Sequence, residues 1–432
     1  MTMKSLLLGA AAGIAAIGAA QAADLPMTKG EAVEYVKVCT TFGPGFFYIP
    51  GSDTCLQIKG EVRADYRVRG ISGSERLETI VDGGAGVITR NSLNLTRDQD
   101  RTRFGAEGRI AFDARTQTDY GLLRSYFQIN ADGMNAAGKT QQFTVDKAFI
   151  QFGGLTAGYA HTFFGYYDAN YGDTIWAPYY ASSNTVNLLA YTAEFGGGFS
   201  ATLALEDGRG HRVVGPNALG YGGQVSPDIV GNIVVDQGWA LGQLSAAVHQ
   251  DRVNEAAHLA GGDDKWGYAV GGTLLFKIPA IDSGHFIVEG AYSDGALEYL
   301  GTNSTAFGGD DFYAGPNNTR KGKGWSIVGE LGGNITPVLN ANLVASYIDT
   351  KYNDLPGFGG HDQFNKEFTI AGNLTYTIVK GLTLGAEIAY THASFNQLES
   401  STTDATTEET TTVFHKGHEN IWEAGIRLKR TF

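Results

Sequence analysis

Alternation between charged and uncharged side chains is the feature of this sequence that most restricts its fold. From Leu56 to Arg69 the chain reads LQIKGEVRADYRVR, in which every second residue is polar or charged and the residues between carry no charge. Successive side chains of a β-strand point to opposite faces, so this segment is predicted to form a strand with one polar and one uncharged face. The segment from Arg101 to Asp113 follows the same pattern.

The same pattern continues to the end of the chain. Polar and apolar side chains alternate from Glu367 to Ile378, from Leu382 to Thr391 and from Trp422 to Phe432. Strands of about 9–11 residues with one apolar face suit a tilted crossing of a lipid bilayer. Mean hydropathy is only −0.14, because half of every such strand faces water. A soluble sandwich or propeller is the alternative, and it would need a partner layer over each apolar face.

Tight turns and long loops alternate between the predicted strands. The turns, rich in Gly, Pro or Asp, are expected near Asp113–Asp119, Gly153–Gly154, Gly196–Gly198, Gln237–Gly238, Pro279–Gly284, Thr336–Pro337 and Lys380–Gly381. The loops are expected at Gly70–Asp100, Ala131–Gln141, Ala160–Asn184, Gly208–Ser226, Asp251–Asp264, Gly295–Lys321, Lys351–Gln363 and Phe395–Lys416. These connections separate 16 strands, with 18 or 14 as alternatives. The sequence therefore predicts an all-β transmembrane antiparallel barrel, wide enough to enclose an aqueous channel.

The N-terminus has the pattern of a secretory signal. Lys4 precedes an apolar run, and Ala20-Gln21-Ala22 offers a small-x-small cleavage site. We expect residues 1–22 to be cleaved, residues 23–55 to form an N-terminal segment on the periplasmic side, and residues 56–432 to form the barrel. A short membrane anchor or a buried helix is the alternative for the apolar run. In an exported protein Cys39 and Cys55 are expected to form a disulfide, with two free buried thiols as the alternative.

Cations accumulate on the polar faces of the first three predicted strands and the last one. First and last strands are neighbours in a closed barrel, so these cations are expected to form one basic wall along the lumen. They either pair locally with carboxylates such as Glu61 and Glu107, or face acidic groups across a narrowing and create a transverse field that filters solutes. The predicted basic wall consists of Lys59, Arg63, Arg67, Arg69, Arg101, Arg103, Arg109, Arg124, Arg427 and Lys429.

The loop after the fifth predicted strand is unusually aromatic for a segment that would otherwise be bathed in water. It reads HTFFGYYDANYGDTIWAPYYASSNT. We expect it to fold into the lumen and narrow it, because exposed apolar area of this size normally packs against something. Packing against outer loops or another subunit is the alternative. The candidate constriction residues are Phe163, Phe164, Tyr166, Tyr167, Asp168, Tyr171, Asp173 and Trp176, and the two aspartates are expected to oppose the basic wall.

Charge and motifs argue against several classes of function. A net charge of −13 argues against nucleic-acid binding, which needs a basic surface. The sequence contains no G-x-S-x-G, Walker or zincin pattern, so no catalytic residue, cofactor or metal is predicted, and the chain is not expected to be an enzyme. Adhesion through the Gly70–Asp100 or Gly295–Lys321 loop is a competing function.

The N-terminal motifs resemble those of the alphaproteobacterial outer-membrane porin family. The similar motifs are Glu34–Val38 followed by Cys39, then Phe47–Gly51, then Cys55 with Leu56; the terminal Phe432 resembles the aromatic residue that the barrel-assembly machinery reads. The resemblance implies a homotrimer of 16-stranded barrels in the Gram-negative outer membrane, each with an inward-folded third extracellular loop. It also implies passive diffusion of small hydrophilic solutes and ions, with outer-membrane lipid and lipopolysaccharide as surroundings. A channel selective for particular solutes such as sugars, stacked on the aromatic loop, is the alternative.

Overall fold

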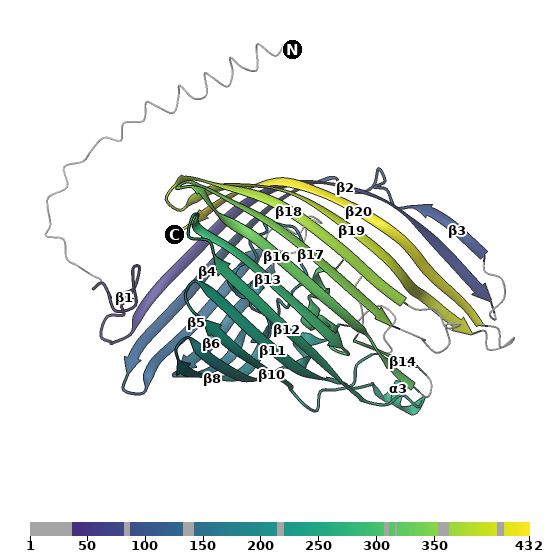
Figure 1. The fold of residues 1–432 in the computed structure, drawn as a ribbon, viewed down its shortest axis with the longest axis horizontal. Helices are drawn as coiled ribbons and strands as arrows, with labels where there is room; N and C mark the ends of the chain where they lie inside the picture. Colours follow the sequence, from purple (N-terminus) through teal and green to yellow (C-terminus); the bar gives the residue numbers. More distant parts are fainter. Residues whose placement is uncertain are drawn as a thin grey trace, which may run out of the picture.

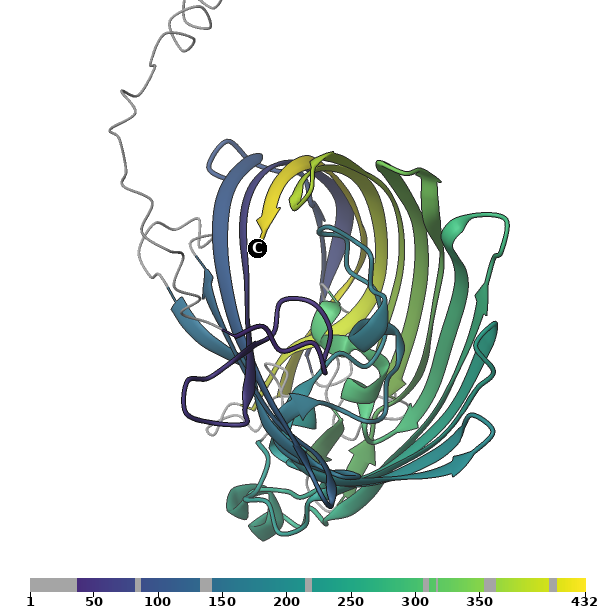
Figure 2. The ribbon, with the colours of Figure 1, turned by 90° about the vertical axis from the view of Figure 1, so that its left-hand side faces the viewer.

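Backbone pairing in the computed structural model closes one antiparallel sheet on itself. Strand β2 (Cys55–Val81) pairs with β4 (Thr102–Thr118) on one side and with β20 (Thr410–Thr431) on the other, and this pairing joins the first and last barrel strands (Figure 1, Figure 2). Among the residues that the structure describes, which are 37–81, 87–132, 142–213, 220–305, 311–315, 318–352, 363–403 and 410–432, the barrel has 16 strands. The predicted strand number is confirmed.

The remaining barrel strands follow one another around the sheet in chain order. They are β5 (Gly121–Asp132), β6 (Gln142–Phe152), β7 (Leu155–His161), β8 (Thr185–Gly196), β9 (Phe199–Glu206), β10 (Asp228–Asp236), β11 (Ala240–Asp251), β12 (Lys265–Lys277), β13 (Asp282–Asp294), β16 (Lys323–Thr336), β17 (Leu339–Tyr352), β18 (Gln363–Val379) and β19 (Leu382–Thr403). Short elements lie outside this ring: β1 (Phe47–Tyr48), β3 (Val87–Ser92), β14 (Phe312–Gly315), β15 (Asn318–Lys321), α2 (Tyr167–Asn170), α3 (Glu255–Leu259), η2 (Gly208–His211), η3 (Leu297–Leu300) and η4 (Thr302–Ser304). In the described part of the chain, no helix has the length and apolar character needed to cross a membrane.

Three predicted connections were placed wrongly. The turn expected at Asp113–Asp119 begins later, because β4 continues to Thr118. The loops expected at Gly70–Asp100 and Phe395–Lys416 are largely strand, since β2, β19 and β20 extend far beyond the other strands and pair with one another. Polar composition at these ends indicated loops, but cross-strand hydrogen bonds satisfy the backbone there as well as water would. The predicted signal segment lies outside the described residues.

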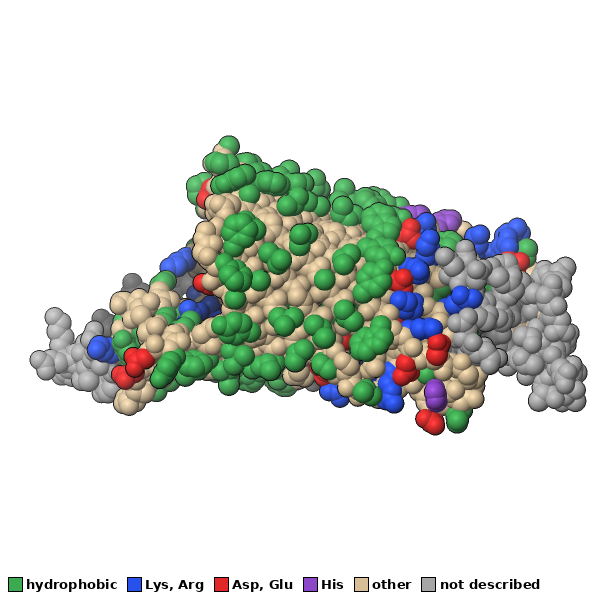
Figure 3. Space-filling model, turned by 60° about the horizontal axis from the view of Figure 1, so that its bottom comes forward, with side chains coloured by type: hydrophobic (Ala, Val, Ile, Leu, Met, Phe, Trp, Pro, Cys, Tyr) green, Lys and Arg blue, Asp and Glu red, His purple; other side chains and the backbone are tan. Residues whose placement is uncertain are grey.

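The apolar faces of the strands form the outer surface of the barrel. Phe104 is 76% exposed and Leu244 is 71% exposed, as expected for side chains that meet hydrocarbon. Apolar side chains are spread over the flank of the molecule in Figure 3, and charged side chains gather toward its ends. The opposite faces carry polar side chains such as Asp65, Glu107 and Glu387, which are buried inside the ring of strands.

Both ends of the barrel chain are fastened at the seam between β2 and β20. Gly60 and Phe432 exchange two backbone hydrogen bonds of 2.9 and 3.0 Å. The Phe432 ring covers Gly60 so closely that a β-carbon there would lie 2.1 Å from it, so any larger residue at this position would displace the ring. The predicted disulfide between Cys39 and Cys55 is confirmed, and it ties the N-terminal segment to the start of β2.

Candidate functional site

The loop between β7 and β8, residues 162–184, contacts the inward faces of strands around most of the barrel. Figure 2 shows it within the ring of strands. Its backbone N–H groups donate to glutamates of four strands, starting with Glu206 of β9, which accepts from Phe163 at 2.9 Å. Glu289 of β13 accepts from Tyr166 and Tyr167, both at 2.9 Å. A loop lying against a wall must find acceptors for its backbone donors, and these carboxylates supply them.

Further along the loop, two more glutamates hold its far end. Glu330 of β16 accepts from the Asp173 N–H at 3.2 Å and from the Tyr167 hydroxyl. Glu387 of β19 accepts from three consecutive N–H groups, those of Ile175 at 2.6 Å, Trp176 at 2.8 Å and Ala177 at 2.9 Å. No other side chain in the described chain bonds three successive backbone groups of this loop.

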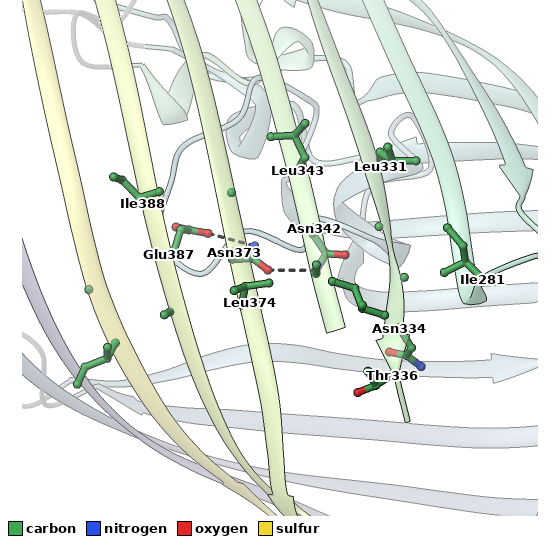
Figure 4. Close-up of a pocket in the computed structure, with 18 of the residues that line it drawn as sticks. Ile281, Leu331, Asn334, Thr336, Asn342, Leu343, Asn373, Leu374, Glu387 and Ile388 are labelled. Atoms are coloured by element: carbon green, nitrogen blue, oxygen red, sulfur yellow. Dashed lines mark hydrogen bonds between the residues drawn. The ribbon is translucent and has the colours of Figure 1, made fainter. Parts of the chain in front are cut away.

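The polar row that includes Glu387 continues onto the neighbouring strands. Asn373 of β18 donates to Glu387 at 3.3 Å, and Asn342 of β17 donates to Asn373 at 3.2 Å (Figure 4). Sequence analysis missed Glu206, Glu289, Glu330 and Glu387. Each is a carboxylate on an inward face whose neighbours are mainly neutral, and that isolation is the signal that would have identified them.

Apolar side chains also bury the loop against the barrel wall. Tyr167 and Tyr180 are fully buried, and Phe164 packs against Tyr299 with ring centroids 4.8 Å apart. On the wall, some inward positions of β8, β10 and β11 are apolar, including Val186, Leu188, Val230 and Leu241, and others carry buried polar side chains such as Gln243. These residues explain why the polar and apolar alternation is weak in this part of the sequence: the inward face contacts the loop instead of water.

Many cations of the predicted basic wall are paired with carboxylates. Arg63 and Arg109 both contact Glu107. Arg124 donates to both oxygens of Asp113 at 2.9 and 3.0 Å, and Arg427 contacts both oxygens of Asp65 at 2.7 and 2.8 Å. Arg115 also pairs with Asp113. Sequence analysis missed Arg115, because the misplaced turn removed it from β4.

A second set of cations has no ion-pair partner among the described residues. Arg67, Arg69, Arg101 and Arg103 surround a cavity of about 170 Å³ that Glu423 also lines. Arg67 lies directly opposite Arg103 in the pairing of β2 with β4, although like charges in opposite positions destabilise a sheet. The Arg67 guanidinium is 5.7 Å from the centre of the Trp176 ring. Lys59 is also exposed and without an ion-pair partner in the described chain.

The two loop aspartates lie in different surroundings. Asp173 lines a cavity of about 310 Å³ together with Arg427 and Lys429 of β20. Burial and the neighbouring Glu330 carboxylate raise the pKa of Asp173 to about 6. Asp168 instead contacts the ring Nε2 of His161 at 3.1 Å and accepts from the Tyr179 hydroxyl.

The connection between β13 and β16 covers part of the β7–β8 loop. Leu297, Glu298, Tyr299 and Leu300 of η3 are fully buried, and a β-carbon at Gly301 would lie 2.4 Å from the Ala181 carbonyl oxygen. The Thr302 hydroxyl of η4 donates to Glu298 Oε2 of η3 at 2.7 Å. The two connections therefore stabilise each other.

We expect this connection to loosen at alkaline pH. Burial raises the pKa of Glu298 to about 8, so its neutral form stabilises the fold fully below pH 4.5, and this contribution is lost as pH rises through about 8. Between pH 4.5 and about 8 the loss is at most about 1.4 kcal/mol per pH unit, and above about pH 8 it levels off. Limited proteolysis at pH 7 and pH 9.5 should show faster cleavage in the connection at the higher pH. E298Q should remove this pH dependence, whereas E255Q, at an exposed glutamate of α3, should retain it.

Comparisons with known proteins agree with this architecture. A family model described as a porin subfamily matches residues 24–424. The chain belongs to the porin family. The porin Omp2b of Brucella canis is 31% identical to this porin over 414 residues, which cover 90% of this chain and 93% of the relative, and Omp2b of Brucella suis is equally similar. The outer-membrane channel DcaP of Acinetobacter baumannii has the same fold, with a TM-score of 0.63, 15% identity, and coverage of 89% of this chain and 99% of that one. This porin is therefore a multi-pass protein of the bacterial outer membrane.

Proposed function

We propose that this porin forms a water-filled channel through which small hydrophilic solutes and ions diffuse passively, and that it acts as a channel and not as an enzyme. The observation that carries the proposal is the closed 16-stranded ring with uncharged side chains outside and charged side chains inside. A ring of this size encloses more space than its inward side chains can fill.

The β7–β8 loop narrows this channel. Its hydrogen bonds to Glu289, Glu330 and Glu387 support a position against the β13–β19 side of the wall, so that solutes pass along the side that carries the cations. Asp173 supports a transverse field, because it shares a cavity with Arg427 and Lys429. Trp176 lies between the two sides, with its ring centre 5.3 Å from Arg427 and its Nε1 3.2 Å from Asp65.

Neutralising the loop aspartates should make the channel prefer anions more strongly. D173N should shift the reversal potential measured across a salt gradient in planar bilayers, because the charge opposing Arg427 and Lys429 is lost. D168N should have the smaller effect, since Asp168 does not line the cavity that Asp173 shares with Arg427 and Lys429. Unchanged reversal potentials in the double variant D168N/D173N would contradict a role for these residues in selectivity.

A second candidate function is a channel selective for solutes that stack on aromatic rings. Tyr166, Tyr171 and Trp176 of the loop are only partly buried, so part of each ring is accessible to a sugar ring. Saturable block of ion current by a sugar favours this function, whereas linear solute flux favours general diffusion.

We further propose a homotrimer surrounded by outer-membrane lipid and lipopolysaccharide and inserted by the barrel-assembly machinery through Phe432. The outer face of β16 to β20 carries a hollow of about 1420 Å³ lined by apolar side chains such as Leu331, Leu343 and Leu374, which a neighbouring subunit or lipid chains can fill (Figure 4). Conductance steps in groups of three would support the trimer.

A further inference from the structure

Three side chains that are far apart in the sequence meet where the β7–β8 loop contacts the wall. Asp173 of the loop, His285 of β13 and Glu330 of β16 each offer one ligand atom, and these atoms all lie within 4.8 Å of one another. His285 Nε2 is 2.8 Å from Glu330 Oε1. We propose that these three residues bind a divalent transition-metal ion, with Zn²⁺ as the best match, and that the bound ion fastens the loop to the barrel wall.

The hydrogen bonds of His285 favour a metal ion at its Nε2 atom. Its Nδ1 atom is 3.1 Å from the Ser283 carbonyl oxygen, which only accepts, so Nδ1 carries the ring proton. A neutral ring then presents a bare Nε2 lone pair to the Glu330 carboxylate, which also only accepts. A metal ion between Nε2 and the Glu330 carboxylate gives both atoms a partner. The alternative is a second ring proton, with which Nε2 donates a hydrogen bond to Glu330. Metal-binding histidines usually donate their other N–H to a backbone carbonyl in this way.

A buried amide oxygen next to this cluster has no hydrogen-bond partner. Asn342 is 92% buried and its Oδ1 atom lacks a partner among the described residues, while its Nδ2 atom donates to Asn340 and Asn373. A β-carbon at Gly332 would lie 2.0 Å from this Oδ1 and 2.9 Å from His285 Nε2. The glycine thus leaves open a space that both atoms border, and Asn342 is placed to support a ligand there.

The donor set indicates the class of metal. One imidazole nitrogen with two carboxylates suits Zn²⁺ and similar first-row ions, whereas Ca²⁺ and Mg²⁺ prefer sites made only of oxygen atoms. Ions can reach the cluster from the lumen, because Asp173 and Asn342 also line the cavity shared with Arg427.

The experiment measures zinc binding to the purified full-length porin in detergent. After treatment with EDTA, the protein is titrated with ZnCl₂ in competition with a chromophoric chelator. We expect one ion per chain that H285Q and D173N each weaken by roughly 10-fold or more, the size of effect seen when metal-site residues are changed. H161Q is the matched control, because His161 also contacts a loop aspartate, Asp168, but in the described part of the chain the two form no group of three ligand atoms within 4.8 Å of one another.

The proposal would be overturned if H285Q and D173N both bound zinc as tightly as the unaltered protein, or if H161Q weakened zinc binding equally. Absence of tight zinc binding in the unaltered protein would also overturn it. Heat-dependent migration in gels checks that each variant is folded. This test involves no ion flow, so its failure is distinct from failure of the proposed channel function. In bilayers, zinc should also shift selectivity toward anions in the unaltered porin but not in D173N.

Discussion

The variant E387A should have a higher single-channel conductance than the unaltered porin and a loop that proteases cleave more readily. Glu387 holds three consecutive backbone N–H groups of the β7–β8 loop. Hydrogen bonds to a charged group contribute about 1.5–3 kcal/mol each, and the three freed donors would be left beside the wall without an acceptor. The far end of the loop should therefore leave the wall, and the fluctuation of the open-channel current should increase with it.

E61A separates loop release from simple loss of charge. Glu61 is also an inward-facing carboxylate, near Lys429 and Arg63 at 4.0 Å each, and among the described residues it makes no hydrogen bond to the loop. Planar-bilayer recordings of the two variants at the same salt concentration provide the comparison. If E61A raised conductance as much as E387A does, charge and not anchoring would be responsible.

The double variant R67Q/R103Q should move the channel strongly toward cation selectivity. Both arginines border the same small cavity and lack ion-pair partners in the described chain, and the cations that line this cavity outnumber its carboxylates, Asp100 and Glu423. The shift in reversal potential should be largest in dilute salt, where the Debye length is about 30 Å, and small in 1 M salt, where it is about 3 Å. Removing two opposed like charges should leave the barrel as stable as before, or slightly more stable.

The variant R124Q tests whether the position of a lumen cation affects ion selectivity more than the total number of lumen cations does. Arg124 is held by both oxygens of Asp113, which Arg115 also neutralises. The single variant R67Q should therefore shift selectivity more than R124Q does. Equal shifts would mean that total lumen charge, and not the unpaired cluster, sets the preference.

Strand number and the orientation of strand faces followed from the sequence, because a period of two is a local property that one-sided burial enforces. Six of the seven turns also followed, since glycine and proline mark them directly, as at Gly153 and Gly381, whose φ angles are positive. The ends of the strands could not be predicted from the sequence. The long β19–β20 hairpin is polar on both faces near its tip, so hydrophobic pattern alone could not distinguish it from a loop.

The arrangement of the site was less accessible from the sequence. The cations could be assigned to one wall because most of them lie on β2, β4, β5 and β20. Strands β2, β4 and β5 are consecutive in the ring, and β20, the last strand, pairs with β2 when the barrel closes. The anchoring of the loop could not be foreseen, because Ile175 and Glu387 are separated by 212 residues and meet only after closure. For the same reason, no local motif brought together Asp173, His285 and Glu330.

Mutations should have different effects along the gene, because the inward faces of β8, β10 and β11 are closely packed and those of the first and last strands are not. Substitutions in the central third of the chain meet a packed interior, and they should behave like core mutations of a soluble protein, lowering yield and heat resistance. Substitutions of unpaired lumen cations near the start of the chain, such as Arg67 and Arg103, should alter permeability while sparing the fold. Natural sequence differences that change which solutes pass through the channel should then be concentrated near the two ends of the coding sequence.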